Sequence, residues 1–156
     1  MRIQSVRTHL LARSQHVPAP PDEVFEFFAD AHNLEAITPP WLGFRVLTPG
    51  PIEMRPGALI EYRLALHRVP VRWLTRIDEW EPGRSFVDVQ VRGPYRLWHH
   101  THSFEERGRG TLVVDRVRYA LPLGPLGALA HAVVVRRDLE RIFDHRHAAI
   151  AQRFTK

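Results

Sequence analysis

The sequence predicts an α+β protein in which a curved antiparallel sheet of about seven strands wraps round one long C-terminal helix. Three observations favour this fold. Two short helical stretches follow the first strand, six β-type stretches with turns between them come next, and one long helical stretch ends the chain, giving the order β-αα-β6-α. A curved sheet cannot touch a helix along its whole length, so we expect an internal cavity between them.

The composition is that of one ordinary globular domain, which we expect to span residues 1–156. Hydrophobic residues make up 44% of the chain and charged residues 25%. There is no cysteine, which excludes disulfides and thiolate metal sites. Because no signal-like or membrane-spanning stretch is found, we expect a cytoplasmic protein with no stable membrane insertion.

The formal net charge of +5 raises the question of nucleic-acid binding. Of the 22 basic residues only Lys156 is a lysine, and the arginines are scattered along the chain. A nucleic-acid face usually has clustered basic residues or a known module. We therefore expect no nucleic-acid partner.

The first elements are a strand and two short helices. Residues 2–17 alternate loosely in polarity, and prolines at positions 18, 20 and 21 end the strand. Asp22 is the expected N-cap of a short, phenylalanine-rich helix. A second short helix is expected at Ala31–Ile37, before Thr38-Pro39-Pro40.

The middle of the chain predicts six strands that are neighbours in sequence and hence antiparallel. They are expected at residues 43–47, 58–66, 71–80, 85–91, 95–106 and 111–121. Polarity alternation directs Trp73, Thr75 and Ile77 inward from one strand, and Asp115 and Tyr119 inward from another. For the strand at 85–91, hydropathy alone favours an inward face of Val87, Val89 and Val91. We favour Phe86, Asp88 and Gln90 instead, because the neighbouring strand is rich in histidine.

That neighbouring strand lies in the stretch RGPYRLWHHTHSF, residues 92–104. Side chains alternate across a strand, so Trp98, His100, His102 and Phe104 share one face. An aromatic ring beside two imidazoles is typical of the wall of a half-polar pocket.

The final helix is expected at about Leu126–Phe154, roughly 43 Å long at 1.5 Å per residue. Its apolar stripe begins with Leu126, Leu129 and Val133. The stripe continues through Leu139, Ile142, Phe143 and Ile150.

Over essentially its whole length this chain resembles the SRPBCC superfamily of START-like, birch-pollen-allergen-like helix-grip proteins, which includes polyketide cyclase/dehydrases. The segments that carry the resemblance are Pro39-Pro40, Pro70–Trp73, Phe86–Gln90, Arg92–Tyr95, Trp98–His102 and Asp115–Pro122. The resemblance implies a hydrophobic small-molecule cavity between sheet and helix, usually with no cofactor. It does not fix the function, because carriers, sensors and enzymes share the fold.

His100 and His102, with Asp88 or Asp115, have the residue types of a two-histidine, one-carboxylate metal site. The alternative is that each imidazole hydrogen-bonds a carboxylate or Gln90 inside the cavity. We favour the hydrogen-bonded alternative, and expect no metal and no cofactor.

The preferred function is binding, as a carrier or sensor, of a hydrophobic or amphipathic small molecule such as a lipid, an isoprenoid, a quinone or an aromatic polyketide. The expected pocket residues are Trp73, Asp88, Gln90, Trp98, His100, His102, Asp115 and Tyr119. One alternative is a cyclase/dehydratase-type enzyme using His100, His102, Asp88 and Asp115 as acid and base. Another is a protein-interaction domain with a residual cavity. A monomer and a homodimer both remain open.

Overall fold

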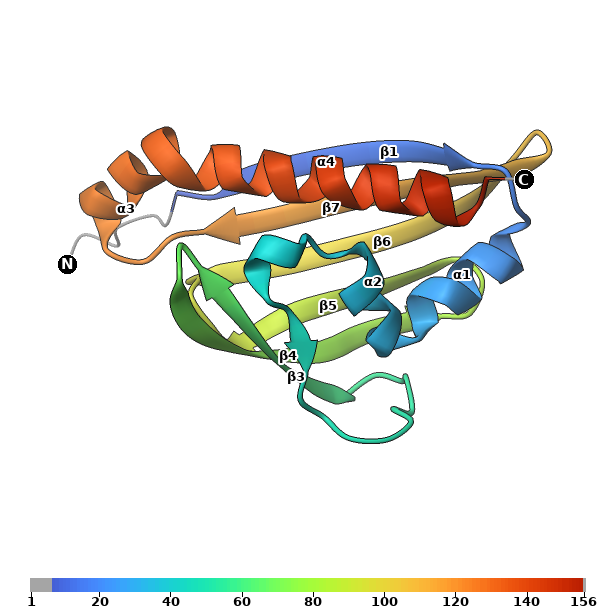
Figure 1. Cartoon of the computed structure of the whole chain (residues 1–156), viewed down its shortest axis with the longest axis horizontal. Coiled ribbons are helices and arrows are strands. Elements are labelled where there is room, and N and C mark those ends of the chain that lie inside the picture. Colours follow the sequence, from blue (N-terminus) through green and yellow to red (C-terminus); the bar gives the residue numbers. More distant parts are fainter. Residues whose placement is uncertain (1–6, 156) are drawn as a thin grey trace.

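The computed structural model describes residues 7–155, and within them one antiparallel sheet of seven strands dominates the fold (Figure 1). The strands are β1 (His9–Val17), β2 (Arg45–Val46), β3 (Leu59–Leu66), β4 (Val69–Glu81), β5 (Ser85–Arg92), β6 (Leu97–Arg107) and β7 (Gly110–Ala120). Their order across the sheet is β1-β7-β6-β5-β4-β3-β2. The predicted fold class is confirmed.

One feature of the topology differs from the prediction. The sequence predicts pairing only between strands that are neighbours in the chain, but β1 pairs with the last strand, β7, from His9 opposite Tyr119 to Val17 opposite Thr111. The chain leaves β1 through the helices and enters the sheet again at its far edge. Residues 2–6 of the predicted first strand lie outside the described residues.

The helices lie against one face of this sheet. They are α1 (Pro21–Ala29), a 3-10 turn (Ala31–Asn33), α2 (Leu34–Ile37), a second 3-10 turn (Pro40–Leu42), α3 (Gly124–Ala130), a π-helical turn (His131–Val135) and α4 (Arg136–Arg153). Figure 1 shows α4 running along β1 and β7, with α1 and α2 below it. Within the described residues, no helix is long and apolar enough to cross a bilayer.

Helix α1 buries its phenylalanines against the sheet. Phe25 makes edge-on contacts with Trp80, Phe86 and Phe104, which fixes this end of the core. The helix begins at Pro21 rather than being capped by Asp22, so the predicted N-cap is wrong. Proline suits the first helical position because its missing N–H would have no helical partner there.

The C-terminal helix is anchored to β1 in its second half. Arg13 pairs with Asp144 at 2.6 Å, and Gln15 donates to the backbone oxygen of His147 at 2.8 Å. The apolar side chains Leu139, Phe143 and Ile150 are buried beneath it. This half of the predicted stripe packs as expected.

The first half of the stripe does not pack. Leu126, Leu129 and Val133 are 69%, 62% and 64% exposed. The π-helical turn at His131–Val135 accounts for the difference, because its extra residue changes the rotational phase of the helix. Side chains before and after that turn therefore no longer share one face.

Candidate functional site

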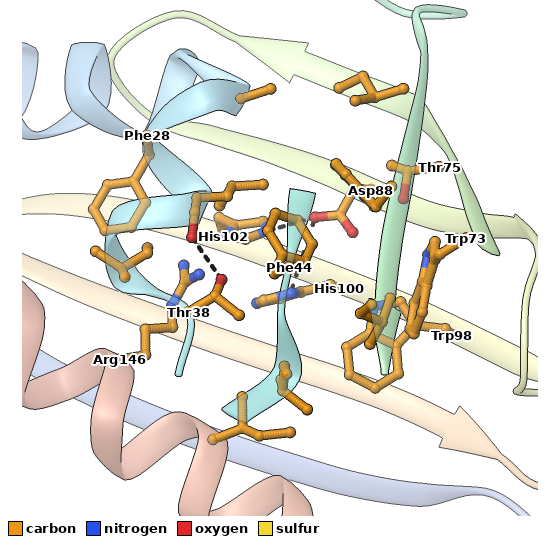
Figure 2. A pocket seen from close by; sticks show the side chains of 18 of the residues that line it. Phe28, Thr38, Phe44, Trp73, Thr75, Asp88, Trp98, His100, His102 and Arg146 are labelled. Carbon is orange, nitrogen blue, oxygen red and sulfur yellow. Dashed lines mark hydrogen bonds and ion pairs between the residues drawn. The ribbon is translucent and has the colours of Figure 1, made fainter. Parts of the chain in front are cut away.

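A cavity of about 180 Å³ lies between the sheet, α2 and α4 (Figure 2). Its walls are mainly apolar and aromatic, and polar side chains gather at one end. The apolar lining includes Phe28, Ala31, Ile37, Leu42, Phe44, Met54, Ile60, Tyr62, Leu64, Trp73, Ile77, Trp98, Leu139, Ile142 and Phe143. The polar end is formed by Asp88, His100, His102 and Arg146.

Five of the eight sequence-predicted pocket residues line this cavity: Trp73, Asp88, Trp98, His100 and His102. They come from β4, β5 and β6, three adjacent strands. Trp73 and Trp98 meet edge to face with ring centres 5.1 Å apart. On β5, Phe86 and Asp88 line the cavity, and the rival face of Val87, Val89 and Val91 does not.

The other three predicted residues do not line the cavity. The side-chain amide of Gln90 makes two hydrogen bonds to the backbone of Tyr95. Its Oε1 accepts from the N–H of Tyr95 at 3.0 Å and its Nε2 donates to the Tyr95 oxygen at 2.6 Å, so Gln90 stabilises the β5–β6 turn. The hydroxyl of Tyr119 lies 2.7 Å from Nε2 of His131. Asp115 lies behind the histidines, on β7. In this structure these three residues therefore lie outside the cavity lining.

The two histidines stack on each other between two carboxylates. Their ring centres are 3.6 Å apart, with His102 also stacked on Phe86 at 4.0 Å. Nε2 of His102 lies 2.5 Å from Oδ2 of Asp88, and Nε2 of His100 lies 2.8 Å from Oδ1 of Asp115. Both imidazoles are buried. The pair thus joins β5, β6 and β7 through charged side chains.

The surroundings shift the pKa values of the two rings in opposite directions. Burial, together with the neighbouring His102, lowers the pKa of His100 below its ordinary value. Burial acts in the same direction on His102, but the neighbouring carboxylates of Asp115 and Asp88 outweigh it and raise its pKa. A proton on this pair is therefore favoured on His102 over His100.

Both carboxylates are held in the charged form. Burial alone would raise the pKa of Asp88, but the hydrogen bond and charge of His102 bring it below the ordinary value. For Asp115 the strongest opposing influence is the guanidinium of Arg146, and the pKa falls well below the ordinary value. The guanidinium lies 3.6 Å from Oδ1 of Asp115.

Arg146 is the site residue that the sequence prediction missed. It lies on α4 with its side chain 12% exposed, and it lines the cavity. Among the described residues, neither its Nε nor its Nη2 has a hydrogen-bond partner. The sequence does indicate its position, because residue 146 lies four residues after Ile142 and three after Phe143 and so shares the helix face that packs on the sheet.

A family model described as polyketide cyclase / dehydrase and lipid transport matches residues 17–145. The chain belongs to this family. The match covers strands β2–β7, the site residues on those strands and α4 as far as His145, whereas Arg146 and β1 up to His16 lie outside it. The resemblance stated from the sequence is thereby confirmed. Among curated proteins, none matches this member of the family.

Solved structures with the same fold come from bacteria and plants. TTHA0849 from Thermus thermophilus is 20% identical, with a TM-score of 0.70 over 94% of this chain and 97% of that one. CV1439 from Chromobacterium violaceum is 15% identical, with a TM-score of 0.72 over 94% of this chain and 97% of that one. Ginseng major latex-like protein 151 from Panax ginseng is 13% identical, with a TM-score of 0.69 over 96% of this chain and 99% of that one. At these identities the likeness shows the fold alone.

Proposed function

We propose that this family member binds a hydrophobic or amphipathic small molecule in the cavity, as a carrier or sensor. The observation that carries the proposal is the composition of the cavity wall, which is aromatic and aliphatic on most sides and charged at one end. Ligand sites in proteins commonly combine apolar walls with a few polar groups that fix the orientation. The description of the matching family, which includes lipid transport, supports this function.

The dimensions and the donors of the cavity favour a ligand with a ring and an oxygen-bearing group. Apolar cavities of about 150 Å³ take up benzene, so about 180 Å³ accepts a ring more readily than a long acyl chain. Trp73 and Trp98 offer ring surfaces. Nε and Nη2 of Arg146 make no hydrogen bond within the described residues, although Nη2 lies 3.6 Å from Oδ1 of Asp115, and Nε can donate to a carbonyl, phenolate or carboxylate oxygen. Quinones and aromatic polyketides fit these features better than fatty acids.

The test is native mass spectrometry of the protein purified from its own host, followed by denaturation and identification of the released compound. We expect a bound compound in the wild-type protein and at least a tenfold loss of the bound fraction in Trp98→Ala. Trp41→Ala is the matched control, because Trp41 is 54% exposed and does not line the cavity. Equal occupancy in both variants would contradict binding in the cavity.

A cyclase/dehydratase-type enzyme is the second candidate, and one observation favours it. His100 donates through its Nε2–H to Asp115, while its Nδ1 lies 3.9 Å from Asp88, beyond hydrogen-bonding distance. A neutral imidazole held by a carboxylate on one side is suited to act as a general base. The opposite pKa shifts of His100 and His102 supply a base and an acid side by side.

The enzyme alternative predicts turnover of a poly-β-ketone substrate analogue to an aromatic product and water, measured by the gain of the product's absorbance. His100→Gln would lower the rate constant kcat by about 100-fold or more while leaving binding in place. Unchanged kcat in this variant would exclude His100 as the base. The interaction-domain alternative predicts a filled cavity, and the open cavity weighs against it.

A further inference from the structure

The arrangement of His100 and His102 has a feature that simple hydrogen bonding does not require. Two His–Asp pairs would need one carboxylate for each ring. Here each carboxylate faces both rings: Oδ2 of Asp88 lies 2.5 Å from Nε2 of His102 and 3.9 Å from Nδ1 of His100. On the other side, Oδ1 of Asp115 lies 2.8 Å from Nε2 of His100 and 3.4 Å from Nδ1 of His102.

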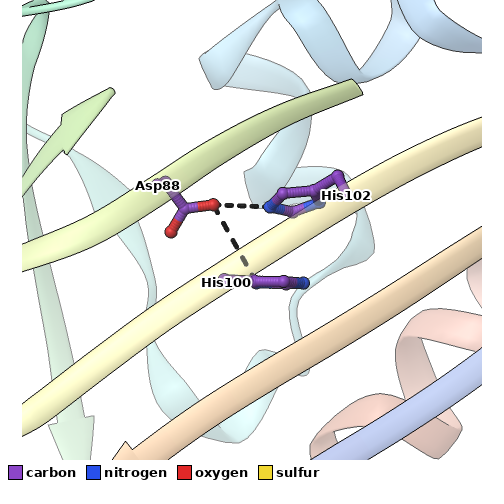
Figure 3. A group of neighbouring side chains, drawn as sticks. All are labelled: Asp88, His100 and His102. Carbon is purple, nitrogen blue, oxygen red and sulfur yellow. Dashed lines mark hydrogen bonds and ion pairs between the residues drawn. The ribbon is translucent and has the colours of Figure 1, made fainter. Parts of the chain in front are cut away.

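The Asp88 side of the cluster has the donors of a metal site (Figure 3). One donor atom from each of Asp88, His100 and His102 lies within 4.8 Å of the others. In a tetrahedral site, ligands about 2.0–2.2 Å from a zinc-like ion lie about 3.3–3.6 Å apart, and the Asp88–imidazole distances of 2.5 Å and 3.9 Å lie on either side of that range. An ion at this position therefore requires the His102–Asp88 separation to lengthen and the His100–Asp88 separation to shorten.

The Asp115 side has the features of the outer support that such sites use. Histidines that bind a metal usually donate their other ring N–H to a carboxylate, which fixes the ring orientation. Asp115 faces the outer nitrogen of both rings, and Arg146 at 3.6 Å offsets its charge. The guanidinium also makes the Asp115 side unfavourable for a cation, so the two sides of the cluster are not equivalent.

We propose that Asp88, His100 and His102 bind a divalent first-row transition-metal ion, of the Zn²⁺ or Fe²⁺ type, with Asp115 as the residue that orients both imidazoles. All three donors line the cavity, so the remaining coordination positions face the ligand-binding space. An oxygen atom of a cavity ligand can then bind the ion directly.

Cobalt(II) titration of chelator-treated protein tests this site, because Co²⁺ bound by nitrogen and oxygen ligands absorbs visible light. We expect one Co²⁺ per chain and displacement of the absorption by Zn²⁺. His100→Ala and His102→Ala should abolish the absorption. His99→Ala is the matched control, since His99 points to the opposite face of β6.

Substituting the two carboxylates one at a time distinguishes the proposed metal ligand, Asp88, from the proposed orienting residue, Asp115. Asp88→Asn should abolish or greatly weaken Co²⁺ binding, while Asp115→Asn should weaken it by about 10–100-fold and keep the one-to-one stoichiometry. If a histidine-to-alanine variant does not fold, as judged by far-UV circular dichroism, the near-isosteric Asp88→Asn variant still tests whether the metal site exists. Wild-type protein without cobalt absorption, or absorption that survives Asp88→Asn, would overturn the metal site. Neither result bears on uptake of a ligand by the cavity, which native mass spectrometry reports separately.

Discussion

At the scale of single residues, the stacked pair of His100 and His102 couples the stability of the fold to pH. The raised pKa of His102 contributes stability that is complete below about pH 6.5 and is lost as pH rises through the folded-state pKa. The lowered pKa of His100 has the opposite effect, because below about pH 6.5 only the unfolded chain takes up that proton. The lowered pKa values of Asp88 and Asp115 matter only under acidic conditions.

We therefore expect the contribution of this pair to the free energy of unfolding to be greatest near about pH 6.5, with a decline on the alkaline side due to His102. In His102→Gln the alkaline decline should disappear. Urea denaturation at a series of pH values measures this effect, with His99→Gln as the control. An alkaline decline of the same size in His102→Gln would assign it to other groups.

The sequence predicts the strand-borne part of the site well and the rest poorly. Alternation on a strand places Trp98, His100 and His102 on one face, whatever lies opposite them. Gln90 follows the same alternation, but a strand end leaves its amide free to bind the turn at Tyr95. Arg146 was missed because a single arginine on a helix is usually solvated.

At the scale of the elements, strand positions follow from turn residues, whereas the helices depend on packing. The predicted boundaries of the strands from 58 to 121 agree with β3–β7 to within about two residues. The π-helical turn at His131–Val135 has the sequence HAVVV, whose three β-branched valines lower the helix propensity but do not specify a π-helical turn. Its effect on Leu126 and Leu129 was therefore not predictable from the stripe.

Helix α1 supports the core through Phe25, which is 6% exposed and does not line the cavity. We expect Phe25→Ala to lower the free energy of unfolding by about 3–5 kcal/mol, because it removes an aromatic ring from a packed cluster. Leu129→Ala, at an exposed position on α3, should change it by less than about 0.5 kcal/mol. Chemical denaturation of both variants makes the comparison, and equal losses would contradict the packing described for α1.

At the scale of the whole molecule, the sheet and the C-terminal helix enclose a space that limits the size of a ligand. We expect saturating 2-naphthol, at about 100 times its dissociation constant, to raise the melting temperature by roughly 5–10 °C. Palmitate should raise it much less, since its chain exceeds a cavity of about 180 Å³.

Two variants connect that effect to the cavity. Ala31→Leu adds volume at a buried lining position and should reduce the shift produced by 2-naphthol. Ala12→Leu adds the same volume at an exposed position on β1 and should leave the shift unchanged. A preference for palmitate in differential scanning calorimetry would indicate that the cavity widens on binding.

The pairing of β1 with β7 has a consequence for the order in which a nascent chain folds. The hydrogen bond from the Thr111 hydroxyl to the backbone oxygen of Ala19 joins positions 92 residues apart. Contacts at such a separation form late, because a long loop must close first. During synthesis, β1 and the phenylalanines of α1 therefore stay exposed until Gly110–Ala120 has left the ribosome. Until then they are the segments that a chaperone would bind.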